Sequence, residues 1–312
     1  MFSDRYIKNV IKTKSHLCVG LDPILCKFPK YILDEAEGLY GKNPKGAGHA
    51  IFEFNKLIID CVFDKVPAVK PQIAYYEKYG QFGIEAFWKT VEYAKKRGLI
   101  VIADAKRGDI GTTSEAYAET FLGNNDEWCV EDSVDAVTVN PFLGRDGVDP
   151  FIILGKENKK GTIILVKTSN PSSGDIQDKI TVNKKTVSEL VCDYINENAT
   201  QTGDYGFSDV AAVIGATYPE DIKKYRTKLP NSLFLIPGIG YQGGDVQLLD
   251  AAFNNEGLGA IITCSRAIDY AFGDTNTSEE IVKQSIISSV ASFNGLINKT
   301  LKECHKVYWE EK

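Results

Sequence analysis

The segment LIVIADAKRGDI, residues 99–110, begins as an apolar run and ends in a cluster of charged side chains. Its first residues have the continuously apolar, β-branched character of a strand that is buried on both faces. Asp104, Lys106 and Asp109 follow directly at its end. Because Asp104 and Lys106 are two residues apart, a strand projects both side chains to the same side. The segment therefore predicts a buried strand that delivers a carboxylate and an ammonium group to one place.

Seven other segments repeat this pattern, and each is followed by a polar or glycine-containing turn and a stretch with helical spacing. With the first segment, the eight predicted strands are residues 16–22, 66–70, 99–106, 135–140, 161–168, 209–215, 233–237 and 259–265. Apolar strands that alternate with helices indicate a parallel sheet covered on both faces, and eight such units most naturally close into a barrel. We therefore predict the α/β class and a (β/α)8 TIM barrel, with an open doubly wound sheet as the alternative.

Helix signals lie between the predicted strands. Residues 81–98, QFGIEAFWKTVEYAKKRG, carry apolar side chains at helical spacing and end in Gly98, a typical C-terminal stop. Thr112 and Glu115 have the spacing of a capping box, which predicts the start of the helix that follows the quoted strand. The residues from Ser278 onward predict a closing amphipathic helix.

Length and composition limit the domain organisation and the classes of function. The chain has 312 residues, more than the roughly 250 typical of such barrels, so we predict insertions, near residues 27–50 and 171–207. No linker-like composition marks a domain boundary, so we predict one domain, residues 1–312. A net charge of −6 argues against nonspecific nucleic-acid binding. The N-terminal residues MFSDRYIKNVIKTKSH predict a short polar helix without a secretory apolar region, and no segment is long enough to span a membrane, so we expect a cytoplasmic protein.

The histidines and cysteines offer little material for a zinc site or a Ser-His-Asp triad. The seven cysteines contain no CxxC pair, and the three histidines are not paired at ligand spacing. We therefore expect neither a zinc site nor such a triad.

Charged residues end three consecutive predicted strands. Asp22 ends the first strand and Lys70, held extended by Pro71, ends the second, while Asp104 and Lys106 end the third. For any one of these charges, a solvated loop or a structural ion pair is the ordinary interpretation. Burying the whole set costs several kcal/mol unless it is fully paired, so stability is a poor reason to keep it. Because active sites of barrels lie at the carboxyl ends of the strands, we interpret the set as catalytic.

A second cluster follows the last two predicted strands. Residues 235–245, LIPGIGYQGGD, contain a GxGxxG pattern that includes Gly240, and Gln242 lies within it. The pattern follows the seventh strand rather than opening a first βαβ unit, which favours a phosphate site over a dinucleotide site, although a simple tight turn is the alternative. Arg266, after the eighth strand, is a bidentate donor suited to phosphate.

Two more strand ends carry weaker signals. Ser169 follows the fifth strand at an exposed polar end that could hydrogen-bond a heterocycle. Asn140, before a proline after the fourth strand, is interpreted first as a loop start and second as a ligand contact.

Together these motifs resemble one family, the orotidine 5′-monophosphate decarboxylases, over residues 16–268. The resemblance rests on the D-x-K-x-x-D element at residues 104–109, the second-strand lysine, LDP at residues 21–23, TSNP at residues 168–171, the PGIG loop with Gln242, and SRAI at residues 265–268. The K-R-G-D form of the element and the two insertions are similar to the longer bacterial and protozoan branch of the family.

The resemblance implies a cofactor-independent lyase that converts orotidine 5′-monophosphate to UMP, the last step of UMP synthesis, and that works as a homodimer. It assigns proton donation to Lys106, contact with the substrate carboxylate to Asp104, and positioning of both to Lys70. It places Asp109 and Thr113 in the neighbouring subunit's site. The remaining implied contacts are Asp22 with the ribose, Ser169 with the pyrimidine edge, and Gln242 and Arg266 with the phosphate. Asn140 and Gly240 are further candidates for substrate binding.

Two other functions are alternatives. A related group of barrels performs Mg²⁺-dependent decarboxylation or aldol chemistry on sugar phosphates and shares the D-x-K-x-x-D element. Those enzymes place a carboxylate where this chain has Lys70, which would repel the ion. A noncatalytic sensor of phosphate ligands is the second alternative, because a fold does not fix a function.

Overall fold

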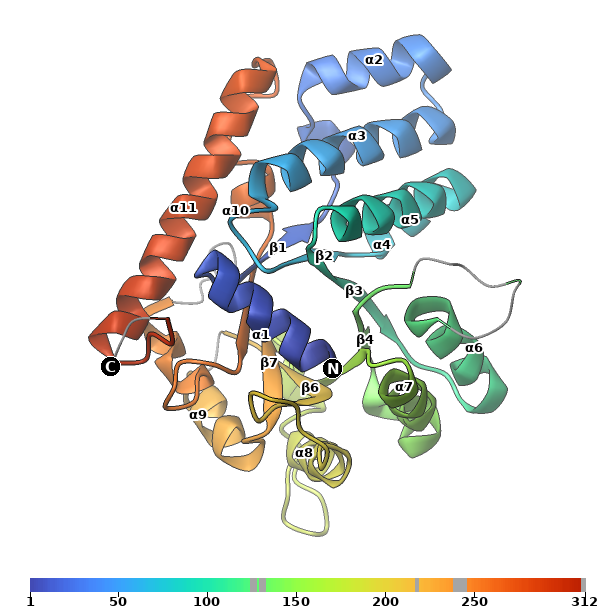
Figure 1. The fold of residues 1–312 in the computed structure, drawn as a ribbon. Helices are drawn as coiled ribbons and strands as arrows, with labels where there is room; N and C mark the ends of the chain where they lie inside the picture. The colour runs from blue at the N-terminus through green and yellow to red at the C-terminus, as the bar shows by residue number, and fades with distance from the viewer. Residues whose placement is uncertain (124–127, 129–132, 217–218, 238–245, 310–312) are drawn as a thin grey trace.

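Eight parallel strands close into a barrel in the order β1 to β8 (Figure 1). The structure is a computed structural model and describes residues 1–123, 128, 133–216, 219–237 and 246–309. The strands are β1 Leu17–Leu21, β2 Ala68–Pro71, β3 Ile100–Arg107, β4 Ala136–Val139, β5 Gly161–Lys167, β6 Ser208–Ile214, β7 Ser232–Ile236 and β8 Ala260–Cys264. The predicted (β/α)8 barrel is confirmed, and each predicted strand is present with ends within two residues of the prediction.

Helices surround the barrel and follow the strands along the chain. They are α1 Phe2–Thr13, α2 Lys30–Tyr40, α3 Pro44–Val62, α4 Ala74–Glu77, α5 Gly80–Lys96, α6 Gly111–Leu122, α7 Arg145–Glu157, α8 Val187–Asn198, α9 Pro219–Lys228, α10 Arg266–Asp269 and α11 Glu279–Glu303, with short 3-10 turns η1 Leu25–Lys27, η2 Pro141–Leu143, η3 Pro171–Asp175 and η4 Val246–Ala252. The segment predicted as a first insertion, residues 27–50, holds α2 and the start of α3. The second, residues 171–207, holds η3 and α8.

Alternation along the strands separates two apolar cores. In β3, Val101 and Ala103 face the surrounding helices, whereas Ile100 and Ile102 face the barrel interior. The same alternation holds in β1, β6 and β8. Asp104 continues the inward-facing series of β3, so the parity of the strand directs its carboxylate to the barrel axis.

Helix α1 closes the amino-terminal end of the barrel and lies across its opening in Figure 1. Phe2, Tyr6, Ile7 and Val10 are buried in the interior core. The Tyr6 hydroxyl donates to the carbonyl oxygen of Ala260 at 3.1 Å. The predicted helix exists, but its description as a polar helix was wrong, because one face packs into the barrel.

Two local helix predictions had different outcomes. Helix α5 ends just before Gly98, whose φ of 82° is the left-handed conformation that glycine favours. The predicted capping box at Thr112 and Glu115 was wrong: α6 begins at Gly111, and its N-cap residue Ile110 makes no side-chain cap hydrogen bond. Ile110 is extended and the helix starts at Gly111, so Thr112 lies within the first turn and not at the cap.

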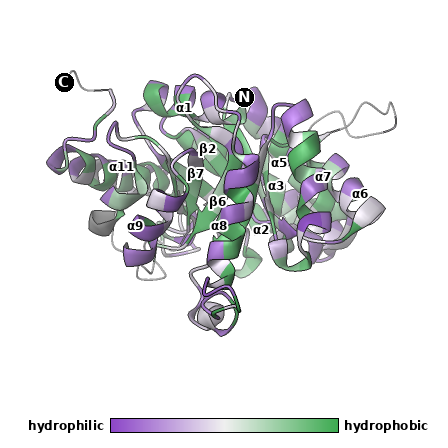
Figure 2. Cartoon of the chain, turned by 90° about the horizontal axis from the view of Figure 1, so that it is seen from below, coloured by the Kyte–Doolittle hydropathy of each residue, from purple (hydrophilic) through white to green (hydrophobic). Residues whose placement is uncertain are grey.

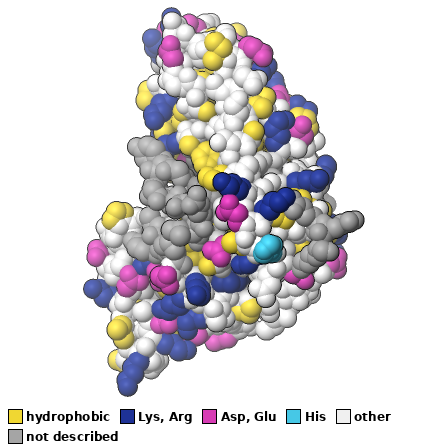
Figure 3. Space-filling view, turned by 90° about the vertical axis from the view of Figure 1, so that its left-hand side faces the viewer, with side chains coloured by type: hydrophobic (Ala, Val, Ile, Leu, Met, Phe, Trp, Pro, Cys, Tyr) yellow, Lys and Arg dark blue, Asp and Glu magenta, His cyan; other side chains and the backbone are white. Residues whose placement is uncertain are grey.

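The outer surface is polar and of mixed charge. Helix α9 is mostly hydrophilic on the hydropathy view, whereas apolar segments gather on the strands (Figure 2). On the face that carries α11, basic and acidic side chains are interspersed (Figure 3). Among the described helices, none is both long and apolar enough to cross a membrane.

Candidate active site

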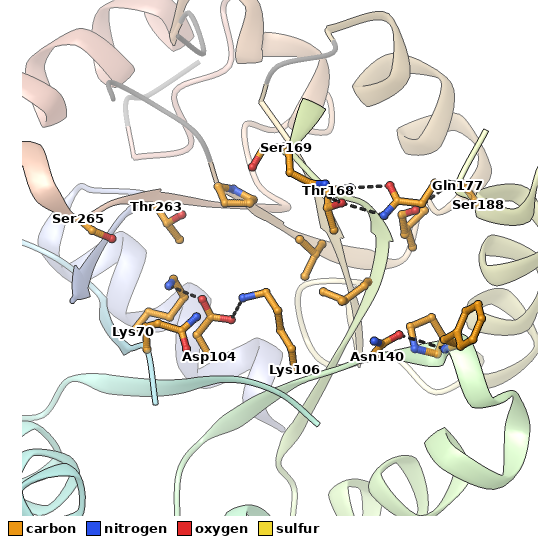
Figure 4. Close-up of a pocket in the computed structure, with 18 of the residues that line it drawn as sticks. Lys70, Asp104, Lys106, Asn140, Thr168, Ser169, Gln177, Ser188, Thr263 and Ser265 are labelled. Atoms are coloured by element: carbon orange, nitrogen blue, oxygen red, sulfur yellow. Dashed lines mark hydrogen bonds and ion pairs between the residues drawn. The ribbon is translucent and has the colours of Figure 1, made fainter. Parts of the chain in front are cut away.

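A cavity of about 900 Å³ opens at the carboxyl ends of the strands. Seven residues singled out from the sequence line it, and they come from six different strand ends: Asp22, Lys70, Asp104, Lys106, Asn140, Ser169 and Arg266. The barrel therefore brings together residues that lie far apart in the sequence. Figure 4 shows the charged group on one wall and the polar residues that follow β5 on the opposite wall.

The two lysines approach Asp104 from either side (Figure 4). The ammonium nitrogen of Lys70 lies 2.8 Å from Oδ2 of Asp104, and that of Lys106 lies 2.5 Å from Oδ1. Lys70 and Asp104 are 5% and 8% exposed, whereas the side chain of Lys106 is 42% exposed and faces the cavity. The predicted row of alternating charges is thus present as a contiguous chain, with Lys106 as its accessible end.

Burial and the neighbouring charges act in opposite directions on this group. Burial alone raises the pKa of Asp104, but the ammonium groups of Lys70 and Lys106 outweigh it and hold that pKa below its usual value. Burial likewise lowers the pKa of Lys70, and the carboxylates of Asp104 and Asp22 more than reverse this, so the pKa of Lys70 is raised. Each pKa shift favours the charged form of its group, which is the carboxylate for Asp104 and the ammonium for Lys70.

The backbone of β3 is irregular where it carries Lys106. Ala103 pairs with Val137 and Arg107 with Val139, so four residues of β3 advance against two of β4. Lys106 itself has a φ of 47°, a left-handed conformation that costs a non-glycine residue about 1–2 kcal/mol. The two-residue spacing correctly predicted that the side chains of Asp104 and Lys106 lie together. The contact is produced by a bulge, however, and not by a regular strand.

Asp22 occupies the neighbouring part of the rim and is backed by a buried carboxyl group. Its backbone N–H donates to Oδ2 of Asp269 at 3.3 Å, and its carbonyl oxygen accepts from the Tyr270 hydroxyl at 2.8 Å. Asp269 is fully buried, and burial together with the nearby charge of Asp22 raises its pKa well above the usual value. The hydrogen bond to the carboxyl group of Asp269 therefore fixes the backbone at Asp22, which faces the cavity.

The opposite wall is formed by the end of β5 and the segment that follows it. Gln177 accepts from the Thr168 backbone N–H at 2.9 Å and donates to its hydroxyl at 2.8 Å. Next to it, the ammonium of the buried Lys167 contacts both carboxylate oxygens of Asp178, at 2.6 and 2.7 Å. These bonds fasten the segment to the barrel beside Ser169.

Close packing of β5 against β6 requires a glycine beside Ser169. A Cβ atom added at Gly215 would lie 2.9 Å from the backbone nitrogen of Ser169, closer than such contacts occur. Glycine at this position therefore lets Ser169 reach the cavity wall.

Other predicted site residues have varied positions. Asn140 lines the cavity but also caps η2, since its side-chain oxygen accepts from the Phe142 N–H at 3.1 Å. Asp109 accepts from the adjacent Ile110 N–H at 2.8 Å. It is not a cavity-lining residue, nor is the exposed Thr113. Gly240 and Gln242 lie outside the described residues.

Several cavity residues were not predicted from the sequence. They include Gln72, Tyr75, Thr168, Gln177, Ser188, Thr263 and Ser265. Thr263 follows the inward-facing Ile261 by two residues and could have been found from strand parity. Gln177 lies in the predicted insertion, where no periodicity indicates a direction.

This arrangement suits a reaction in which negative charge develops on a bound anion. The accessible ammonium of Lys106 faces the cavity beside the buried carboxylate of Asp104, and Arg266 lines the same cavity. Preorganised charges of this kind stabilise a transition state without having to reorganise. Among the described residues, no group of three or more His, Cys, Asp or Glu is arranged to hold a metal ion.

A family model, curated relatives and a solved structure all relate this chain to the same family. Residues 15–281 match the model of the orotidine 5′-phosphate decarboxylase / HUMPS family. The chain is 38% identical over 298 residues to orotidine 5′-phosphate decarboxylase of Caldicellulosiruptor saccharolyticus, covering 93% of this chain and 97% of that protein. It is 40% identical over 263 residues to the enzyme of the same name from Rhodopirellula baltica, covering 84% and 86%. The solved structure of Leishmania donovani OMP decarboxylase is similar, with a TM-score of 0.72, 26% identity and coverage of 96% and 98%.

Proposed function

The chain belongs to the orotidine 5′-phosphate decarboxylase / HUMPS family, and on this premise we propose how its residues carry out the reaction. The relatives and the fold identify the activity as decarboxylation of orotidine 5′-monophosphate to UMP in pyrimidine synthesis. We propose that Lys106 stabilises the carbanion left at ring carbon 6 and then protonates it.

The chemistry requires a cation at this point. Loss of CO2 breaks the bond between the carboxyl carbon and carbon 6, and the electron pair stays on carbon 6, where no adjacent carbonyl can delocalise it. The ammonium of Lys106 faces the cavity, so it can lie beside the developing charge and lower its energy. Transfer of its proton to carbon 6 then completes UMP and leaves a neutral amine, which solvent reprotonates.

Asp104 is proposed to lie against the substrate carboxylate. Because Lys70 and Lys106 keep it ionised, it repels that carboxylate in the ground state and less so as CO2 leaves. Lys70 holds its other oxygen, which fixes the carboxylate relative to Lys106. Binding of the remote phosphate offsets the repulsion.

The remaining contacts are assigned by position on the rim. Asp22 is proposed to bind the ribose hydroxyls, since it lies beside Lys70 at the end of the neighbouring strand. Ser169 on the opposite wall is proposed to bind the pyrimidine edge, and Asn140, which also lines the cavity, is proposed as a further substrate contact. Arg266 is proposed to bind the phosphate, together with Gly240 and Gln242, which lie outside the described residues.

We propose that the working form is a homodimer in which Asp109 and Thr113 reach the neighbouring site. Neither lines the cavity of its own chain. The adjoining connections expose three large apolar side chains, Ile110, Phe142 and Leu143. If a second copy covers this surface, Asp109 and Thr113 of each chain would reach the cavity of the other chain. A two-fold interface makes this exchange reciprocal.

The dimer proposal is tested by mixing two inactive variants. In a 1:1 mixture of Lys106→Ala and Asp109→Asn, dissociated and reassociated, about a quarter of the sites should be intact. Recovered activity supports a shared site. A mixture that stays as inactive as its components contradicts it.

We also propose that residues 1–312 form one domain and that the protein is cytoplasmic. Support for one domain comes from α1, which fills the barrel interior, and from α11, which packs on α3.

The observation that carries the mechanism is the contact of both lysines with the two oxygens of Asp104 at the cavity wall. The test is Lys106→Ala, assayed for release of CO2 and for UMP binding. We expect a fall in kcat of at least about 10³-fold with UMP binding retained. Unchanged turnover would contradict the role of Lys106.

A further inference from the structure

Thr138 on β4 is a buried hydroxyl group that the mechanism does not yet use. Its side chain is fully buried and is not part of the cavity wall, so it is not placed to touch a ligand. It follows the inward-facing Ala136 by two residues, which directs it to the barrel axis beneath the charged array.

The hydroxyl of Thr138 bridges two parts of the catalytic strand. It donates to Oδ1 of Asp104 at 3.0 Å and accepts from the backbone N–H of Lys106 at 2.9 Å. Oδ1 of Asp104 is also the oxygen that contacts the Lys106 ammonium, at 2.5 Å. One hydroxyl therefore fixes Lys106 at both ends, directly at its backbone and through Asp104 at its ammonium.

The bulge in β3 explains why such a group is needed. The residues between Ala103 and Arg107 depart from the regular register with β4, and Lys106 has a left-handed φ of 47°. A strained conformation persists only where its surroundings hold it. The hydrogen bond from the Lys106 N–H to the Thr138 hydroxyl connects β3 to β4 at this irregular part of the pair.

We propose that Thr138 is a positioning residue that sets the place from which Lys106 stabilises and protonates carbon 6. The inference rests on the proposed function, in which Lys106 is the proton donor. Thr138 acts through Lys106 and Asp104 and makes no contact with substrate. Misplacement of a reacting group by about 1 Å is enough to lower a rate by about 10²-fold.

Thr138→Val and Thr138→Ser separate the hydroxyl from the shape of the side chain. Valine keeps the branched shape and removes the hydroxyl, so we expect kcat to fall about 10- to 100-fold, with KM for orotidine 5′-monophosphate and affinity for UMP changed by less than about threefold. Serine keeps the hydroxyl and should restore kcat to within about fivefold of the original enzyme.

Thr162 provides a matched control for loss of structure. It is a buried threonine on β5 whose hydroxyl donates to the carbonyl oxygen of Phe151 at 2.9 Å, outside the cavity. Thr162→Val should lower the thermal midpoint by a similar amount and leave kcat unchanged. If Thr138→Val does not fold, Thr138→Cys replaces it, with an expected fall in kcat of at least about fivefold, because a thiol hydrogen-bonds weakly.

Three results would overturn the inference. The first is an unchanged kcat in Thr138→Val, or in Thr138→Cys where that variant replaces it. The second is an equal loss of kcat in Thr138→Val and Thr162→Val. The third is a kcat in Thr138→Ser that is as low as in Thr138→Val. Lys106→Ala distinguishes this failure from failure of the proposed function. If Lys106→Ala is inactive while Thr138→Val keeps its kcat, only the role of Thr138 is wrong.

Discussion

The ammonium nitrogen of Lys70 lies 2.8 Å from Oδ2 of Asp104, and both side chains are almost completely buried at the ends of the neighbouring strands β2 and β3. A buried ion pair is often no more stabilising than well-packed apolar groups of the same volume. Its position beside the accessible Lys106 therefore argues for a catalytic purpose.

Removal of one partner of this pair should affect both stability and catalysis. Lys70→Met leaves the buried Asp104 carboxylate with one ammonium in place of two. We expect the free energy of unfolding to fall by about 2–4 kcal/mol in urea denaturation at pH 7. Because Asp104 is no longer fixed, kcat/KM should fall at least about 100-fold.

The exposed pair of Lys89 with Glu85, at 2.5 Å, is the control for the lysine substitution. Lys89→Met should change the free energy of unfolding by less than about 0.5 kcal/mol. Equal effects of the two substitutions would show that burial of the Lys70 pair does not matter.

Acid sensitivity should depend on His16. The imidazole is buried between the rings of Phe253 and Trp309, and burial lowers its pKa to about 3. Below pH 6.5 the unfolded chain therefore binds a proton that the folded protein excludes, so stability falls as the pH decreases from 6.5 towards 3. Relative to His16→Gln, the original protein should lose about 2 kcal/mol more of its free energy of unfolding between pH 7 and pH 5.

The exposed His305 serves as the control for this pH dependence. His305→Asn should leave the slope of stability against pH unchanged. If His16→Gln keeps the original slope, another group is responsible for the acid sensitivity.

Fastening of the segment after β5 should determine substrate affinity. Gln177→Leu removes both hydrogen bonds to Thr168 and loosens the wall that carries Ser169. We expect KM for orotidine 5′-monophosphate to rise about 5- to 50-fold and kcat to change less. Asp193→Asn removes the exposed contact of Asp193 with Lys185 near this segment and should alter KM less than about twofold. Similar values of KM in both variants would contradict the role of Gln177.

Treatment with EDTA tests the Mg²⁺-dependent alternative. Hard cations need oxygen ligands, and Lys70 occupies the strand end where that mechanism requires a carboxylate. Activity on orotidine 5′-monophosphate should stay within about twofold after the chelator is added. Loss of activity that Mg²⁺ restores would favour the alternative.

The strands and most of the charged site could be predicted from the sequence because both depend on local patterns. Apolar runs locate the strands, and two-residue spacing shows which side chains share a face, as for Asp104 and Lys106. The same parity argument could have found Thr138, two residues before Asn140. It was missed because a lone threonine in a strand carries no charge signal.

Other features depend on contacts that no local pattern specifies. The left-handed φ of Lys106 arises from the pairing of β3 with β4, and the contacts of Gln177 arise from the fold of an aperiodic segment. The capping box at Thr112 was wrong because α6 begins at Gly111, which places Thr112 inside the first turn. The apolar face of α1 was missed, although Phe2, Tyr6 and Val10 recur at helical spacing.

The central claim is that Lys106 delivers a proton to carbon 6 of the pyrimidine ring, and the reverse reaction tests it most directly. By microscopic reversibility, the original enzyme in D2O should exchange the hydrogen at carbon 6 of bound UMP for deuterium, which NMR can follow. We expect Lys106→Ala to bind UMP and to reduce the exchange rate by at least about 10³-fold. Exchange at the original rate in Lys106→Ala would contradict the claim, because another group would then be the proton donor.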